Sequence, residues 1–249
     1  MNYGLCPLSI VPVREAAADT SELVTQVLYG EHFKVLESRA KWSKIRLEWD
    51  AYEGWIDNKQ LVSISKEQYV ALSAAPDILS ADLVDFVTHS NGQLMPIPIG
   101  SCVHACDLLG HTHEGNTLSG TIEKAHIVNT ALLYLNSPYL WGGKTPFGID
   151  CSGFTQMVYR LNGYRLKRDA SQQATQGDAF SFIEECEPGD LAFFDNKEGD
   201  IIHVGIVLKD NYIIHAHGQV RIDRLDHTGI FNAERNTHTH KLRVLKRIV

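Results

Sequence analysis

Short apolar runs separated by polar turns fill residues 11–65 of the chain. Between residues 43 and 47 polar and apolar residues alternate, which is typical of a strand with one face in water. No long amphipathic helical pattern interrupts these runs. The pattern therefore predicts a small β-barrel in the first part of the chain.

A second stretch, residues 66–119, has a weaker pattern. It begins with a helical or linker segment at residues 66–75, reaches Pro76, and then repeats short apolar runs up to residue 100. We expect a linker helix followed by a second, degenerate small β-domain here. From residue 120 onwards helical and strand patterns are mixed, so the predicted fold class is α+β.

An amphipathic helix is predicted directly after Asp150. Its apolar residues follow the helical spacing i, i+3, i+4 and i+7, and they are Phe154, Met157, Val158 and Leu161. Asp150 is a favourable N-cap, and Asn162 and Gly163 favour termination. Cys151 would lie in the first turn, where unpaired backbone N–H groups and the helix dipole favour the thiolate. This position suits a nucleophile.

A candidate base lies downstream, in a predicted β-hairpin that turns near residues 209–211. If the loop holds an odd number of residues, His203 and His215 share one face and can reach each other. His203 would then be the base for Cys151, and His215 or its neighbour His217 would orient it. A two-residue loop would instead send the two histidines apart.

Each of these residues alone has a plainer interpretation. A single cysteine at a helix start is more often a small packing residue, and a histidine in a strand is more often a hydrogen-bonded core residue. The joint placement of a cysteine and two histidines favours the catalytic interpretation.

Composition and charge narrow the possible partners. The chain has 249 residues, of which 44% are apolar and 21% are charged, as in ordinary globular proteins. Its formal charge of -7 disfavours nucleic acid and anionic membranes, which are bound through clustered lysines and arginines. No stretch is apolar enough to span a bilayer.

The cysteines indicate a reducing compartment. There are five of them, an odd number, and they are scattered along the chain rather than arranged as a disulfide framework. Residues 1–7 have neither the basic nor the apolar region of a secretory signal. We therefore expect a cytoplasmic protein.

A metal site is considered and set aside. Cysteine and histidine are zinc ligands, and five of them lie close together, namely Cys102, His104, Cys106, His111 and His113. Their spacing fits no common zinc pattern, so we expect neither a metal nor another cofactor. Of the histidines near the C-terminus, His227, His238 and His240 are interpreted as surface residues, and residues 241–247 as a closing strand.

Four short motifs resemble the NlpC/P60 family of cell-wall cysteine peptidases. They occur in the family's order, at residues 139–143, 150–154, 203–206 and 214–216. The resemblance covers residues 120–249 and implies a papain-like domain in which a helix packs on an antiparallel sheet. It also implies Cys151 as nucleophile, His203 as base and His215 as the orienting residue. The backbone N–H of Cys151 and the hydroxyl of Tyr139 would then stabilise the oxyanion.

The first part of the chain resembles bacterial SH3 domains, at residues 13–14, 21–24, 26–31 and 52–56. The combination resembles γ-D-glutamyl-L-diamino acid endopeptidases. The implied domains are an SH3 domain at 1–65, a linker helix with a degenerate second SH3-like domain at 66–119, and the catalytic domain at 120–249.

That resemblance also implies how the peptide is held. Asp150, Ser152 and Ser171 would contact the peptide. Glu22 and Tyr52 of the SH3 domain would cap the cleft, so that only a free N-terminal L-Ala fits. A carboxylate there could bind the ammonium, whereas burying that charge unpaired would be costly.

The predicted function is hydrolysis of the γ-D-Glu to L-diamino acid bond in murein tri- or tetrapeptides, as part of cell-wall peptide recycling. Two alternatives stay open: a wall-binding SH3 protein with an idle catalytic domain, and an acyltransferase that passes the same thioester to an amine. The preferred diamino acid, diaminopimelate or lysine, is left open by the sequence.

Overall fold

The structure is a computed structural model that describes residues 2–249; Met1, which opens the stretch examined for a secretory signal, lies outside the described residues. The chain forms two compact units. Unit 1 contains the chain up to Gly120 together with Trp141–Pro146, and unit 2 contains Thr121–Leu140 and Phe147–Val249. The division into three domains that the sequence implies stays a prediction.

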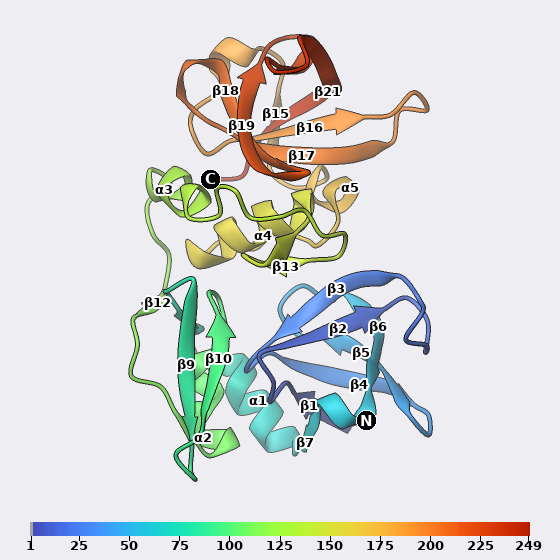
Figure 1. Ribbon diagram of the computed structural model, residues 1–249, viewed down its shortest axis with the longest axis vertical. Helices are drawn as coiled ribbons and strands as arrows, with labels where there is room; N and C mark the ends of the chain where they lie inside the picture. The colour runs from blue at the N-terminus through green and yellow to red at the C-terminus, as the bar shows by residue number, and fades with distance from the viewer. Residues whose placement is uncertain (1) are drawn as a thin grey trace. The chain divides into compact units, whose positions relative to one another are not determined.

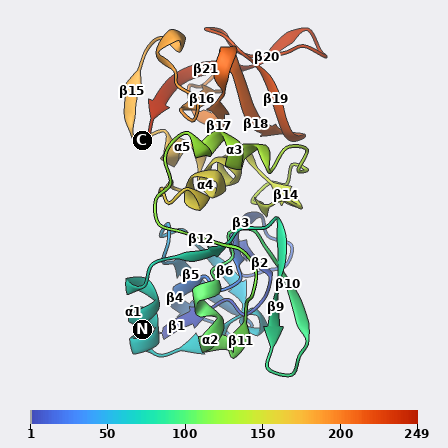
Figure 2. The same cartoon turned by 90° about the vertical axis from the view of Figure 1, so that its left-hand side faces the viewer.

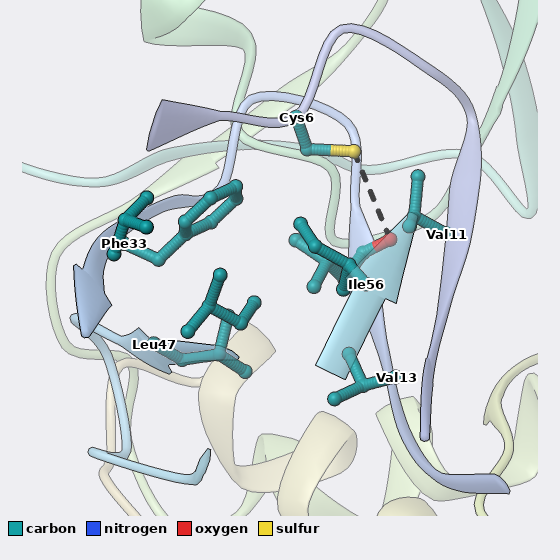
Figure 3. Packing of buried hydrophobic residues seen from close by; sticks show 9 residues of the cluster. Cys6, Val11, Val13, Phe33, Leu47 and Ile56 are labelled. Atoms are coloured by element: carbon teal, nitrogen blue, oxygen red, sulfur yellow. Dashed lines mark hydrogen bonds between the residues drawn. The ribbon is translucent and has the colours of Figure 1, made fainter. Parts of the chain in front are cut away.

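Unit 1 begins with a β-barrel, in which the strand order is β3-β2-β6-β5-β4-β1-β7. Apolar side chains from several of these strands fill its core, and Val11, Phe33 and Ile56 are almost fully buried there (Figure 3). The strands are β1 (Asn2–Leu5), β2 (Ile10–Arg14), β3 (Leu23–Leu28), β4 (His32–Ser38), β5 (Trp42–Leu47), β6 (Glu53–Asp57) and β7 (Val62–Ile64).

The expected helix at residues 66–75 is confirmed as α1 (Lys66–Ala74). Ser65 caps it, because its hydroxyl accepts a hydrogen bond from the backbone N–H of Gln68, whose side chain binds back. Two small sheets follow, β10-β9-β11 and β12-β8. The remaining elements of unit 1 are η1 (Asn58–Gln60), β8 (Ile78–Ser80), β9 (Val84–His89), β10 (Leu94–Pro98), η2 (Val103–Ala105), α2 (Cys106–Leu109), β11 (His111–Thr112), β12 (Thr117–Ser119) and β13 (Lys144–Thr145).

The segment Trp141–Pro146 is fastened to the barrel of unit 1 by polar contacts. The indole Nε1 of Trp141 donates to Oε1 of Glu22 at 2.6 Å. Lys144 is buried; its backbone N–H donates to Oε1 of Gln26 at 2.8 Å, and its Nζ lies 3.5 Å from Oε1 of Glu31. A segment distant in sequence thus supplies a buried cation to the barrel.

Unit 2 is built on an antiparallel sheet with the order β15-β21-β16-β17-β18-β19-β20. Because β20 also pairs with β21, the strands from β21 round to β20 close on themselves. The expected closing strand is confirmed within β21. The strands are β15 (Asp178–Phe180), β16 (Leu191–Asp195), β17 (Ile201–Val207), β18 (Tyr212–His217), β19 (Gln219–Leu225), β20 (Gly229–Asn232) and β21 (Thr237–Arg247).

The three α-helices described in unit 2 lie on one side of this sheet (Figures 1 and 2). α4 packs against β17 and β18, and α3 packs against α4. The elements are α3 (His126–Leu132), β14 (Gly148–Ile149), α4 (Cys151–Leu161), α5 (Ala170–Gln173), η3 (Ile183–Glu185) and η4 (Lys209–Asn211). The predicted α+β class is confirmed. Among residues 2–249 no helix combines the length and apolar character needed to cross a bilayer.

Candidate active site

Helix α4 places Cys151 at its first position, as the sequence predicts. Asp150 is the N-cap, and its Oδ1 accepts a hydrogen bond from the backbone N–H of Gly153 at 2.6 Å. Every residue of α4 is buried, and Cys151 is 7% exposed. The thiol therefore lies at the end of a rigid, almost fully enclosed helix.

A buried arginine that the sequence analysis missed holds this helix start in place. Arg168 is 1% exposed, and its guanidinium donates to both carboxylate oxygens of Asp150, at 3.0 Å and 2.7 Å. Its Nη1 also lies 2.9 Å from the hydroxyl oxygen of Ser152. The bidentate pair fixes the residues on either side of Cys151.

The hairpin of β17 and β18 has the register that brings the two histidines together. Ile206 pairs with Ile214, and the backbone N–H of Leu208 donates to the carbonyl oxygen of Tyr212, so the three residues of η4 form the loop between paired positions. Its residues Asp210 and Asn211 have positive φ, which these residue types tolerate. The odd loop length is confirmed, and the structure therefore excludes the two-residue alternative.

Nε2 of His203 lies 2.8 Å from Nδ1 of His215, and both rings are buried. His217, the rival for the orienting position, is half-buried, and its ring centroid is 6.5 Å from that of His203. Gly205 makes room for this pair, because a Cβ added there would lie 2.9 Å from Cβ of His215. Of His215 and His217, it is therefore His215 whose ring nitrogen lies within hydrogen-bond distance of His203.

Two further groups at the histidine pair were missed. Asp223 on β19 accepts from Nε2 of His215 at 3.0 Å. His240 on β21 stacks on His203, with ring centroids 4.1 Å apart. The interpretation of His240 as a surface residue is thus wrong, because β21 folds back beside β16 and carries the ring into the cluster. His227 and His238 are exposed, as predicted.

Burial dominates the electrostatics of the pair. It raises the pKa of the Cys151 thiol to about 12, and the nearby charge of Asp150 adds to this rise, while backbone hydrogen bonds from Val204 and Ser152 and the charge of Arg168 oppose it. Burial also lowers the pKa of His203 well below 6.5, and its neighbouring histidines add to that. The thiolate expected at the helix start is therefore not favoured, because burial favours the neutral thiol and the neutral imidazole.

The histidine cluster predicts that the protein loses stability in mild acid. The pKa values of His203, His215, His217 and His240 are all lowered from 6.5, chiefly by burial. Below pH 6.5 the unfolded chain therefore binds protons that the folded chain does not, so the free energy of unfolding rises with pH in this window. Urea unfolding at pH 5.5, 6.5 and 7.5 should show a progressive loss towards pH 5.5.

His240→Gln supplies the control for this pH dependence, because the variant removes a group whose pKa is lowered to about 4. Its unfolding free energy should depend less steeply on pH below 6.5. Equal stability of the wild-type protein at pH 5.5 and 7.5 would contradict the prediction.

The other predicted site residues fall into two groups. In unit 2, Tyr139 is half-buried, and its pKa is raised by burial, with the charges of Cys151 and Asp150 adding to the rise. Ser171 is exposed on α5. In unit 1, Glu22 is exposed beside Trp141, and Tyr52 packs against the barrel core. The roles assigned to all these residues stay predictions.

The cysteine and histidine segment that invited a zinc interpretation is divided by the fold. Cys106 and His111 both contact the hydroxyl of Tyr29, and His113 pairs with Asp85. Cys102 and His104 instead gather with Asp77, and their ligand atoms lie within 4.8 Å of one another. Of the described residues, this trio is the group that could hold a metal ion.

Comparison with known families agrees with this geometry. A family model described as the NlpC/P60 family matches residues 136–238, which span Cys151 and both histidines of the pair. A second, described as a bacterial dipeptidyl-peptidase Sh3 domain, matches residues 13–61 within the barrel of unit 1.

Relatives and a solved structure extend the likeness over most of the chain. The chain is 28% identical over 217 residues to the gamma-D-glutamyl-L-lysine dipeptidyl-peptidase of Bacillus subtilis, covering 77% of this chain and 71% of that protein. It is 29% identical over 246 residues to dipeptidyl-peptidase 6 of Lysinibacillus sphaericus, covering 83% and 85%. The crystal structure of an NlpC/P60 family protein from Bacillus cereus shares the fold, with a TM-score of 0.82, 19% identity and 99% of both chains covered. The chain therefore carries an NlpC/P60 cysteine-peptidase domain and a bacterial SH3 domain.

Proposed function

We propose that this peptidase hydrolyses the γ-D-Glu to L-diamino acid bond of murein tri- or tetrapeptides. The observation that carries the proposal is the buried Cys151 at the start of α4 together with the His203–His215 pair in the same unit. A relative covering 77% of the chain is named a gamma-D-glutamyl-L-lysine dipeptidyl-peptidase, which supports this substrate class.

The proposed reaction proceeds in two halves through a thioester. Sγ of Cys151 attacks the γ-carbonyl carbon of the D-glutamyl unit while the imidazole of His203 takes the thiol proton. The backbone N–H of Cys151 and the hydroxyl of Tyr139 stabilise the oxyanion. The C–N bond then breaks, and the imidazolium of His203 gives its proton to the leaving amine of the diamino acid.

Water completes the second half. His203 takes a proton from water, whose oxygen attacks the thioester, and the proton passes to Sγ as the C–S bond breaks. The dipeptide L-Ala-D-Glu is released and the thiol is restored. Since burial favours the neutral thiol and imidazole, His203 acts as a general base in the attack rather than meeting a preformed thiolate.

We further propose that the enzyme acts in the cytoplasm on recycled peptides that carry a free N-terminal L-Ala. The requirement for a free amine follows from the predicted roles of Glu22 and Tyr52. Asp150, Ser152 and Ser171 are the proposed peptide contacts in unit 2.

Mass spectrometry of cleavage products tests the substrate. L-Ala-γ-D-Glu-L-Lys and its meso-diaminopimelate counterpart should each be incubated with the enzyme, beside N-acetylated forms of both. We expect release of the free diamino acid and L-Ala-D-Glu, at least tenfold faster from the peptides with a free amine.

The possible results separate the parts of the proposal. If no peptide is cut, the substrate assignment fails. If acetylated and free peptides are cut equally, the substrate stands and the amine requirement fails. A product joined to an added amine, formed in place of the hydrolysis product, would favour the acyltransferase alternative.

A further inference from the structure

The histidine pair continues into a buried carboxylate, which makes a hydrogen-bonded series of three side chains, His203, His215 and Asp223. Nε2 of His203 lies 2.8 Å from Nδ1 of His215, and Nε2 of His215 lies 3.0 Å from Oδ2 of Asp223. His215 and Asp223 are 0% and 6% exposed. The two contacts use different ring nitrogens of His215, so the position of the proton on His215 sets the direction of both hydrogen bonds.

Asp223 is itself held rigidly. Nε of Arg221 donates to its Oδ2 at 2.7 Å and Nη2 to its Oδ1 at 3.1 Å. Nδ2 of Asn232 lies 3.3 Å from Oδ1. Burial alone would raise the pKa of Asp223, but the hydrogen bonds from His215 and Arg221 lower it below the ordinary value. The group is therefore an ionised carboxylate, which can only accept hydrogen bonds.

We infer that Asp223 is a positioning residue that fixes the tautomers of both histidines and so makes Nδ1 of His203 the atom that takes the thiol proton. The inference rests on the proposed function, because it specifies how that same site moves a proton.

The proton positions follow one from the next. An acceptor at Oδ2 requires the proton of His215 to sit on Nε2, and a neutral imidazole has only one N–H. Nδ1 of His215 must then accept, so Nε2 of His203 carries the proton it donates. The lone pair of His203 is left on Nδ1. Reversing the tautomer of His215 would place two N–H groups opposite each other, or leave Nδ1 of His203 without its lone pair.

The groups around His203 and His215 favour the neutral form of both imidazole rings. Besides Asp223, the charged or titratable groups around His215 are His203, His217, His240 and Arg221. Arg235 acts on His217, and Glu234 pairs with Arg221. When His203 takes the thiol proton, the negative charge of Asp223 stabilises the imidazolium through His215. This helps the transition state more than the ground state.

Nitrogen NMR of the full-length protein with ¹⁵N-labelled histidine reads the tautomers without any substrate. We expect His203 and His215 both to carry their proton on Nε2 at pH 7.5, with signals assigned from His203→Asn and His215→Asn variants. In Asp223→Ala, His215 should shift towards the Nδ1–H form. A wild-type spectrum with His215 protonated on Nδ1 would overturn the inference.

Kinetics provide the second readout. Asp223→Ala should lower kcat about 10- to 100-fold, the size of loss found when the hydrogen-bond partner of a metal-ligating histidine is removed, while KM stays within about twofold because Asp223 is buried. Asp226→Ala is the matched control, because Asp226 pairs with the exposed His238 and makes no hydrogen bond to His203, His215 or Asp223 in the structure described. Equal losses in both variants would overturn the positioning role.

Asp223→Asn keeps the side-chain volume if the alanine variant fails to fold. Its lower kcat at near-native Tm would support the positioning role, and an unchanged kcat would refute it. Failure of the wild-type enzyme to cut any murein peptide would instead contradict the proposed function, since the NMR result does not depend on the substrate.

Discussion

Replacing Cys151 by alanine should lower kcat/KM for the murein peptide by about 10⁴-fold or more, because losses of this size follow removal of a covalent nucleophile. The remaining histidines have no acyl acceptor to activate except water. Since the change removes only one buried sulfur atom from α4, Tm should move by no more than a few degrees. Steady-state kinetics check the expected kcat/KM, and a thermal melt of the same preparation checks the expected Tm.

Cys186→Ala is the matched control for this result. Cys186 is a partly buried cysteine of the same unit that packs against the core of the sheet rather than against the histidines. Its replacement should leave kcat/KM within about twofold. Substantial activity in the Cys151 variant, or a comparable loss in the Cys186 variant, would show that the nucleophile has been assigned to the wrong residue.

Replacing Arg168 by methionine should destabilise unit 2 by about 3–5 kcal/mol, the cost of breaking a buried ion pair by removing one partner. The change takes away the guanidinium that donates to both oxygens of Asp150 and lies against Ser152. Because these residues flank Cys151, kcat/KM should fall as well. Urea unfolding of the variant gives the first quantity and peptide cleavage the second.

Two further variants separate charge from geometry at this position. Arg168→Lys keeps the positive charge but cannot form the planar two-point contact, so it should recover only part of the lost stability. Arg165→Met removes an exposed arginine from the same loop and should change the unfolding free energy by less than about 0.5 kcal/mol. If Arg168→Met unfolds no more easily than Arg165→Met, the ion pair does not hold the helix start.

The features predicted correctly from the sequence are those whose signals are local. The apolar spacing after Asp150 predicts a helix that begins at Cys151, although every residue of α4 is buried and not one face alone. The three-residue loop at Lys209–Asn211 fixes which side of the hairpin His203 and His215 share. The helix start and the shared face of the two histidines each follow from the spacing of residues within a segment of fewer than about fifteen residues.

The missed residues have partners that only the folded chain brings near. Arg168 lies in a polar stretch that reads as an exposed loop, and its partner Asp150 is on another element. Asp223 lies between Ile222 and Arg224 in a strand, where a charged residue would ordinarily face solvent and an isoleucine the core. In the fold Asp223 is buried and Ile222 is 38% exposed. The alternation of polar and apolar residues cannot predict that a strand buries its aspartate and exposes its isoleucine.

The thiolate expectation failed for a reason of magnitude. A helix N-terminus stabilises an anion by about 0.3–1 kcal/mol at the surface and up to about 2 kcal/mol in favourable buried geometries. Enclosing a charge costs several kcal/mol even after the protein relaxes. With Cys151 almost fully buried, the second effect exceeds the first. The position in the helix was predicted correctly, but its degree of enclosure was not.

The fastening of Trp141–Pro146 to the barrel bears on how such a protein can evolve. The chain leaves unit 1 after Gly120, returns at Trp141 and leaves again after Pro146, so neither unit is a contiguous gene segment. A recombination event that exchanged the barrel at residue 120 would carry away Glu31 and leave Lys144 behind in the host sequence. The barrel and the peptidase unit are therefore expected to be inherited together rather than exchanged separately by recombination. Lys144 and Glu31 are expected to change as a pair.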